Sequence, residues 1–424
     1  MRKILLSIAC VLACMSADCQ TLDECQQAAR DNYPLIGRYG LIEKTTQLTV
    51  ENIAKKGWLP QVEAYGQGTL QSGVAQLPDV LTQMTSQMGY SARGLSKAQY
   101  KAGLNASQTI YDGGAISARK QVVRAQANVE RAQTDVDMYQ VRQRVNELFF
   151  GILLVEERIQ IAQDLSALLK SNEQQLEKMF RGGVAMECDY NSIKAERISA
   201  DRQLTELNAT RNQLQQVLSV FTGMQIGKLV RPDETLAGVG NNRPELRLLD
   251  NQLLLADAQE KEVKAGLMPT VGAFAQGYYG YPGYDMFHDM FHRKPTLNGI
   301  VGLKVSWNIS NLFTHKNDLA KVGLQREYAE NQREIFLFNN RLEQIQQTDE
   351  INKYRKMIDE DREIVDLRTK VRKSHESKLR HGIINVNDLL QEITRESNAK
   401  TELSIHEVEM LKAMYDLKFL VCSF

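Results

Sequence analysis

The stretch FRGGVAMECDYNSIKAE (180–196) returns 199 residues later as LRHGIINVNDLLQEITR (379–395). Three pairs of residues match at this constant distance: Arg181 with Arg380, Gly183 with Gly382, and Asp189 with Asp388. A long helical pattern enters each stretch and another leaves it. Glycine tolerates the positive φ that a sharp turn needs. Both stretches are therefore predicted to be tips of helical hairpins, and the chain contains the same hairpin twice.

The rest of the sequence extends this duplication. NYPL at 32–35 reappears as NRPE at 242–245, LP at 59–60 as MP at 268–269, and QG at 67–68 as QG at 276–277. Self-similarity of this kind indicates a repeated structural plan. We predict a signal peptide over 1–19, a first repeat over 20–222, a linker over 223–241 and a second repeat over 242–424.

Each repeat is predicted to carry one moderate helix, two strands and one hairpin of long helices. In the first repeat these are a helix over 21–58, strands over 59–72 and 98–111, and a hairpin over 113–222. In the second they are a helix over 242–266, strands over 268–281 and 297–309, and a hairpin over 311–421. LNGIVGLKVSWNI (297–309) alternates apolar and polar residues as a strand does.

The helices of the hairpins are unusually long. Residues 115–180 contain no proline and a single glycine, Gly151. At about 1.5 Å per residue such a helix spans roughly 100 Å. Apolar residues recur along it at steps of three and four, which is typical of helices packed as coiled coils.

Composition and motifs exclude several classes of function. The 52 basic residues balance 52 acidic ones, whereas a nucleic-acid-binding protein shows a basic surplus. No nucleotide-binding or hydrolase motif occurs, so we expect neither an enzyme nor a cofactor.

The N-terminus predicts export. Arg2 and Lys3 precede a short apolar run, and Ala17-Asp18-Cys19 fits a cleavage site. Lipidation at Cys14 is the alternative. Of the cysteines beyond the signal, Cys25 and Cys422 form a disulfide only if both termini return to one end; otherwise these two and Cys188 are unrelated thiols.

Four strands per chain cannot close a membrane barrel, because such barrels begin at about eight strands and open edges are not tolerated in lipid. The alternating strands therefore predict oligomerisation, as a dimer with 8 strands or a trimer with 12. The polar strand faces would line the lumen.

These features together resemble the TolC-type family of outer-membrane efflux proteins. The resemblance rests on the tandem repeat, on TLDECQQAARDNYPLI from Thr21, on TIYDGG from Thr109, and on the two tips. It implies an α+β membrane protein: a homotrimer in which each chain gives four strands to a shared 12-stranded barrel in outer-membrane lipid. The long antiparallel helices would form a periplasmic α-barrel beneath it, in a Gram-negative-type cell.

The resemblance also implies partners and site residues. A periplasmic adaptor protein and an inner-membrane pump are expected, with adaptor contacts at Arg181, Gly182, Gly183, Val184, Ala185, Arg380, Gly382, Ile383 and Ile384. The tunnel entrance would be gated at Asp388, Gln391, Ile384, Leu379, Glu187 and Asp189. Asp388 falls on an acidic position of the family, but Gln391, Leu379 and Ile384 replace an acid, a tyrosine and an arginine, which predicts a weaker charge ring and a different latch.

The implied function is a passive exit duct of a tripartite export system, with small-molecule efflux as the main expectation. A duct for type I protein secretion and a periplasmic coiled-coil scaffold that conducts nothing are the alternatives.

One further segment has metal-ligand residue types. MFHDMFH (286–292) places His288 and His292 four residues apart, with Met286, Met290 and Asp289 beside them. Such residues can hold a soft metal ion. Without a defined scaffold, an amphipathic loop at the cell surface is the default interpretation, and no metal is expected.

Overall fold

The computed structural model describes residues 20–91, 94–234 and 242–421. Three predictions concern residues outside these ranges: the signal peptide, the alternative lipidation at Cys14, and the pairing of Cys25 with Cys422. The chain divides into two compact units, and each contains segments of both repeats. One comprises the N-terminal residues up to Gly40 with Ala132–Leu248 and Gln332–Phe424, and the other comprises Leu41–Arg131 and Leu249–Asn331.

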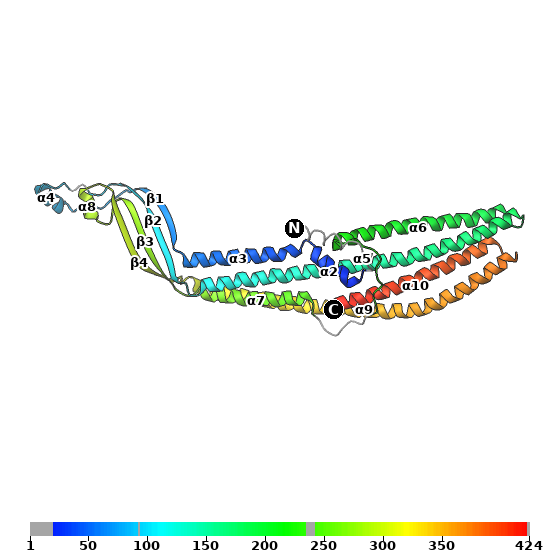
Figure 1. The fold of residues 1–424 in the computed structure, drawn as a ribbon. Coiled ribbons are helices and arrows are strands. Elements are labelled where there is room, and N and C mark those ends of the chain that lie inside the picture. Colours follow the sequence, from blue (N-terminus) through cyan, green and yellow to red (C-terminus); the bar gives the residue numbers. More distant parts are fainter. Residues whose placement is uncertain (1–19, 92–93, 235–241, 422–424) are drawn as a thin grey trace, which may run out of the picture. The chain divides into compact units, whose positions relative to one another are not determined.

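The unit of 41–131 and 249–331 contains a four-stranded antiparallel sheet (Figure 1). Its strands are β1 (Gln61–Leu70), β2 (Ala98–Tyr111), β3 (Thr270–Tyr281) and β4 (Thr296–Ser306), and they lie in sequence order. Within the described chain β1 and β4 are therefore edge strands. On β4 the predicted apolar face is exposed, with Leu297, Val301, Leu303 and Val305 all at least 70% accessible.

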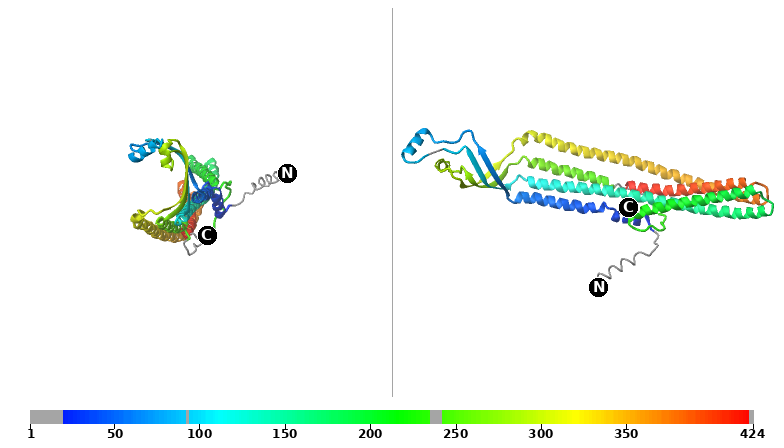
Figure 2. Two further views of the ribbon diagram at one scale, coloured as in Figure 1. Left: turned by 90° about the vertical axis from the view of Figure 1, so that its left-hand side faces the viewer. Right: turned by 90° about the horizontal axis from the view of Figure 1, so that it is seen from above.

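Helical segments continue from the strands in the same unit. They belong to α3 (Ile36–Trp58), α5 (Ala115–Arg181), α7 (Pro244–Ala265) and α9 (Asn311–Arg380), and they lie side by side in that order (Figure 2). Arg131 of α5 pairs with Glu43 of α3 at 3.3 Å, and Arg326 of α9 pairs with Glu260 of α7 at 2.6 Å. Each of these two helix pairs is thus joined by an ion pair.

The joint between β2 and α5 is made by the predicted YDGG segment. The Asp112 carboxylate accepts hydrogen bonds from the backbone N–H groups of Gly114 at 3.0 Å and Ile116 at 2.6 Å. Gly113 has a φ of +66°, and a Cβ at this position would lie 2.2 Å from the Cβ of Met268. The joint therefore requires glycine there, and α5 begins at Ala115, two residues after the predicted start of the hairpin.

Two stretches between strands contain short helices, α4 (Asp79–Gln87) and α8 (Met286–Phe291). For residues 286–292 the default interpretation from the sequence was a loop. Met290 of α8 packs with Leu95 and Tyr281 in a small apolar core. Asp289 is buried, and its carboxylate accepts a hydrogen bond from the Gly283 N–H at 2.5 Å. The region is folded around these two side chains.

The single helix predicted over 21–58 is wrong. The structure has α2 (Leu22–Asn32) and α3, separated by Tyr33-Pro34-Leu35. Tyr33 is extended, with φ −67° and ψ 130°, because a following proline disfavours helical geometry. Thr21 and Glu24 form a reciprocal capping box that starts α2.

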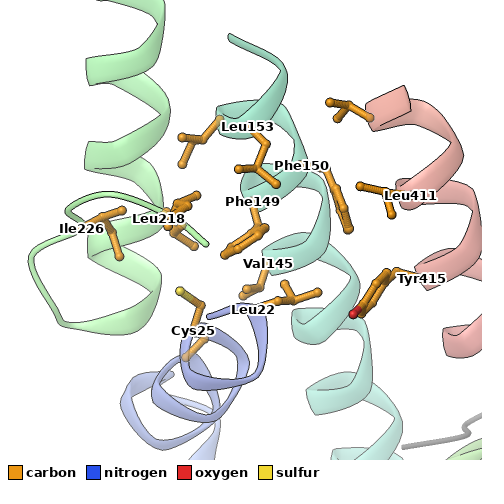
Figure 3. Packing of buried hydrophobic residues seen from close by; sticks show 14 of the residues in the cluster. Leu22, Cys25, Val145, Phe149, Phe150, Leu153, Leu218, Ile226, Leu411 and Tyr415 are labelled. Atoms are coloured by element: carbon orange, nitrogen blue, oxygen red, sulfur yellow. The ribbon is translucent and has the colours of Figure 1, made fainter. Parts of the chain in front are cut away.

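The main core of the other unit gathers around α5 (Figure 3). Phe149 and Phe150 of α5 are at most 1% exposed, with α2, α6 (Glu187–Thr222) and α10 (Val386–Val421) packed around them. Ile226 and Leu229 also enter this core. The described part of the predicted linker is thus packed structure, not a loose connection.

A buried arginine joins α7, α5 and α10 in this unit. The Arg243 guanidinium lies over the rings of Tyr139 and Phe419, at 5.1 and 5.0 Å from their centroids. It donates to the Glu245 carboxylate at 2.9 and 2.5 Å. Tyr139 stacks on Phe419 at 4.2 Å and donates its hydroxyl to the Phe419 carbonyl. Arg243 lies just before α7. This helix begins at Pro244, whereas the sequence predicted a start at residue 242.

Candidate functional site: the hairpin tips

The two hairpin tips fold into the same turn. Gly183 has a φ of +73° and Gly382 a φ of +70°. The next residue in each tip returns its N–H to the end of the preceding helix: Val184 to Met179 O at 2.9 Å, and Ile383 to Lys378 O at 3.0 Å. Gly182, grouped with these glycines from the sequence, is not in the left-handed region. One glycine per tip therefore meets the conformational demand.

The acids predicted at the tunnel entrance also start the returning helices. The Asp189 carboxylate accepts from the Met186 N–H at 3.3 Å, and the Asp388 carboxylate accepts from the Asn385 N–H at the same distance. Each aspartate is the third residue of its helix, where a carboxylate satisfies a free donor and favours the helix dipole. The structure thus gives both residues a capping contact.

A shared apolar core lies behind the tips and joins the two hairpins. Val386, Leu390 and Ile393 of α10 pack with residues of α5 and α6. The α5 and α6 members of this core are Leu169, Leu176, Ile193 and Ala200. Ala185 and Leu379, two of the predicted site residues, pack against it while partly buried.

The remaining predicted residues lie at the surface of the tips. Val184 is 75% exposed and its repeat equivalent Ile383 is 70% exposed. Glu187, Arg380 and Gln391 are also exposed, and Ile384 is half-buried. Arg181 pairs with Glu177 at 2.6 Å. The tips thus present two equivalent apolar side chains at their apices, surrounded by polar groups.

Sequence reasoning missed an aromatic contact in the first tip. Phe180 and Tyr190 stack with centroids 6.2 Å apart and planes within 7°. Their repeat equivalents are Leu379, which packs against the apolar core behind the tips, and Leu389, which is part of that core. The sequence did contain a signal that Tyr190 packs against another residue, because the offset of 199 residues aligns it with the apolar Leu389 of the second tip.

Above the second tip, buried carboxylates of α10 are held by cations. Glu396 is 3% exposed and contacts Arg372 of α9 and Lys400, the latter at 2.9 Å. Thr369 also donates to it, at 2.9 Å. Burial acts to raise the pKa of the Glu396 carboxyl, but the hydrogen bonds from Lys400 and Thr369 and the charge of Arg372 outweigh it, so this pKa lies below its usual range. These contacts bind α9 to α10.

The candidate metal residues are partly committed to the fold. Met290 packs in the small apolar core with Leu95 and Tyr281, and the buried Asp289 carboxylate accepts a hydrogen bond from the Gly283 N–H. The rings of His288 and His292 stack with centroids 4.5 Å apart. Among the described residues, no group of three or more His, Cys, Asp or Glu side chains could hold a metal ion.

None of the helices in the described part of the chain is both long and apolar enough to cross a membrane.

Residues 51–223 match the family model described as outer membrane efflux protein. The chain resembles this family over that segment. The resemblance inferred from the tips and the repeat is thereby confirmed. Among curated protein sequences, none matches the chain significantly.

Solved structures share the fold. The outer-membrane channel OprN superposes with a TM-score of 0.68 at 14% identity, covering 95% of this chain and 90% of that one. The CmeC outer membrane channel of Campylobacter jejuni gives 0.67 at 13% identity, covering 95% and 86%. The outer membrane protein VceC of Vibrio cholerae gives 0.65 at 13% identity, covering 94% and 96%.

The family match and the fold together bear on three of the predictions: the location, the fold class and the absence of enzymatic activity. The chain is an outer-membrane protein with a large periplasmic part, it is mostly helical with a small antiparallel sheet, and it is not an enzyme. These three predictions are confirmed.

Proposed function

We propose that this protein is the passive exit duct of a tripartite export system and serves small-molecule efflux. Three copies would share a 12-stranded barrel in the outer membrane, and their helices would form a periplasmic tunnel. A periplasmic adaptor would bind the tips and connect the duct to an inner-membrane pump.

The observation that carries the proposal is the incomplete sheet. Within the described residues, strands β1 and β4 have free edges, and β4 exposes a row of large apolar side chains. In lipid every backbone donor and acceptor needs a partner, so the edges must be paired by other strands. Pairing β4 of one copy with β1 of the next would satisfy both edges, and three copies would give 12 strands.

The adaptor contact is proposed at the apices of the tips. Val184 and Ile383 are exposed apolar side chains at equivalent places in two rigid turns. Exposed apolar residues ringed by polar ones are typical of protein interaction sites. A trimer would present six such apices, which suits a partner that binds in repeated units.

The gate is proposed at the ring of acids just above the apices. In the second tip the gate would consist of Asp388 with Leu379, Ile384 and Gln391. In the first tip it would consist of Glu187 and Asp189. The capping bond engages one carboxylate oxygen of Asp388, so this contact is compatible with cation selection.

Conductance in planar lipid bilayers tests this function. Asp388→Asn removes the charge but keeps an oxygen that can accept the capping bond, and Asp189→Asn is the matched change in the other tip. We expect discrete cation-selective openings from the wild type and at least a twofold loss of selectivity in Asp388→Asn. Equal selectivity in all three proteins would remove Asp388 from the gate.

The same measurement separates the alternatives. A folded oligomer that never conducts, even with the tip glycines replaced to loosen the turns, would support the scaffold. To test cargo, the gene is deleted and susceptibility to antibiotics is compared with the amount of secreted protein. Increased susceptibility supports efflux, and loss of a secreted protein alone supports the type I secretion duct.

A further inference from the structure

A small polar cavity lies in the unit that contains the main core. Helices α2, α3, α5 and α7 line it, and its volume is about 210 Å³. All of its lining residues fall within the ranges of this one unit. In the predicted repeats α2, α3 and this part of α5 belong to the first and α7 belongs to the second, so side chains of both repeats meet here.

Three arginines on three helices line the cavity: Arg30 on α2, Arg142 on α5 and Arg247 on α7. The carboxylates of Asp23 and Asp135 line it as well. The lining thus has more positive than negative charge. Guanidinium groups gathered in one place repel one another, and an anion bound among them removes this repulsion.

Both carboxylates have interactions of their own. Asp23 is exposed in the first turn of α2, where the helix dipole favours its charge. Asp135 accepts a hydrogen bond from the Tyr39 hydroxyl at 2.6 Å. Burial raises the pKa of Tyr39 to about 12, and the hydrogen bond to Asp135 acts in the same direction, whereas the charges of Arg30 and Arg247 lower it. The Tyr39 hydroxyl therefore remains a donor to Asp135 at neutral pH, and both guanidiniums lie near it.

The buried side of the cavity is held in place by hydrogen bonds. Gln26 of α2 is 5% exposed. Its Oε1 accepts a hydrogen bond from Arg142 Nε at 2.7 Å, and its Nε2 donates to Asn146 Oδ1 at 2.5 Å. Arg142 is therefore fixed on the inner side, whereas Arg30 and Arg247 are exposed on the outer side.

We propose that this cavity binds a phosphate-type oxyanion through Arg30, Arg142 and Arg247. A planar guanidinium donates paired N–H bonds that match the oxygens of a phosphate group. The oxygens of a tetrahedral oxyanion point in several directions, so one group can contact guanidiniums that come from three helices. The space is many times the roughly 10–15 Å³ that one water needs, so a hydrated phosphate group fits.

The ligand is either inorganic phosphate or the phosphomonoester of a small molecule, since both present the same oxygens. In either case the bound anion connects α2 and α5 with α7, and so links the two repeats. This inference does not depend on the proposed duct, because the cavity lies within a single chain.

Isothermal titration calorimetry of the purified full-length protein tests the site, with inorganic phosphate and with glucose 6-phosphate as probes. The variant Arg30→Gln, Arg247→Gln removes the two exposed guanidiniums and leaves the contact between Arg142 and Gln26 in place. The control Arg38→Gln, Arg144→Gln removes two exposed guanidiniums of the same unit that do not line the cavity. Sodium chloride at equal ionic strength controls for screening.

We expect the wild type and the control to bind phosphate equally. The Arg30→Gln, Arg247→Gln variant should bind it about tenfold or more weakly, because it has lost charge-assisted hydrogen bonds. Phosphate should also raise the midpoint of thermal unfolding of the wild type and the control, since a ligand that binds only the folded state stabilises it. This rise should disappear in the variant. Tighter binding of glucose 6-phosphate than of phosphate would assign the site to a phosphomonoester, and the reverse would assign it to inorganic phosphate.

A folded wild type that binds neither probe at millimolar concentration overturns the site. Equal affinity in the wild type and the Arg30→Gln, Arg247→Gln variant overturns it too, as does an equal loss in the control. Circular dichroism establishes that each protein is folded, and the single change Arg247→Gln gives the answer if the double variant is not. Bilayer conductance of the same samples is a separate readout, so failure of the phosphate site and failure of the proposed duct are distinguishable.

Discussion

Arg197 and Glu396 occupy the same position in the two hairpins and carry opposite charges. Arg197 of α6 pairs with Glu173 of α5 at 2.5 Å, and Glu396 of α10 contacts Arg372 of α9. The third members are inverted as well: Asp201 lies 2.6 Å from Arg197, and Lys400 lies 2.9 Å from Glu396. The repeat has thus preserved the geometry of an ion-pair triad while reversing the sign of every charge.

This inversion predicts that charges in the second hairpin can be exchanged only together. Glu396→Arg alone sets an unpaired cation against Arg372 and Lys400 in a buried place, which costs about 3–5 kcal/mol. The triple change Arg372→Glu, Glu396→Arg, Lys400→Asp recreates the triad of the first hairpin and should recover most of the loss. Thermal denaturation of the purified proteins compares them. A triple variant no more stable than Glu396→Arg would contradict the equivalence of the triads.

The Glu396 carboxylate also predicts a pH dependence. The pKa of Glu396 is lowered in the folded state. Its ion pairs therefore contribute stability at pH values above the pKa that Glu396 has in the unfolded chain, and this contribution is lost as the pH falls through the pKa that it has in the folded protein. Glu396→Gln should lower stability by about 1.5–3 kcal/mol at pH 7. The difference from the wild type should shrink as the pH is taken below 4. Denaturation series at several pH values measure it, and a constant difference would contradict the assignment.

Asp416 of α10 predicts a pH dependence of stability with the opposite sign. Burial raises the pKa of its carboxyl to about 6, and the charge of Lys412 opposes this only in part. Folding then favours the protonated acid, so stability is lost as pH rises from about 4 to above 6. Asp416→Asn should stabilise the protein at pH 8 by up to about 3 kcal/mol and leave it unchanged near pH 3.5. A variant that is less stable at pH 8 would show that the charged form is needed.

The tip glycines give a matched set of substitutions. Gly183→Ala and Gly382→Ala force a side chain into a left-handed turn and should each cost about 1–2 kcal/mol. Gly182→Ala is the control, since Gly182 has no positive φ and a Cβ there would meet nothing closer than 3.4 Å. Limited proteolysis at the tips and denaturation provide the readout. Equal effects at all three positions would indicate that the turn is not the cause.

Local features of this protein followed from neighbouring residues. The tip turns depend on a glycine and on an aspartate a few positions later, and the alternation along β4 is written in consecutive residues. The break between α2 and α3 was equally local, because Pro34 stands in the sequence, yet the surrounding helical pattern concealed it. The contact between Phe180 and Tyr190 was hidden for another reason: it forms across the tip, between the end of α5 and the start of α6.

Tertiary structure decided what the sequence left open. Each compact unit combines segments of both repeats. The described linker residues Ile226 and Leu229 pack in a core with α2 and α5. Turns, caps and strand alternation are set by φ/ψ preferences and hydrogen bonds within a few residues, so the sequence alone determined them. Which apolar face is covered, and which charge finds its partner, depends on segments some 200 residues apart, and only the folded chain brings these together.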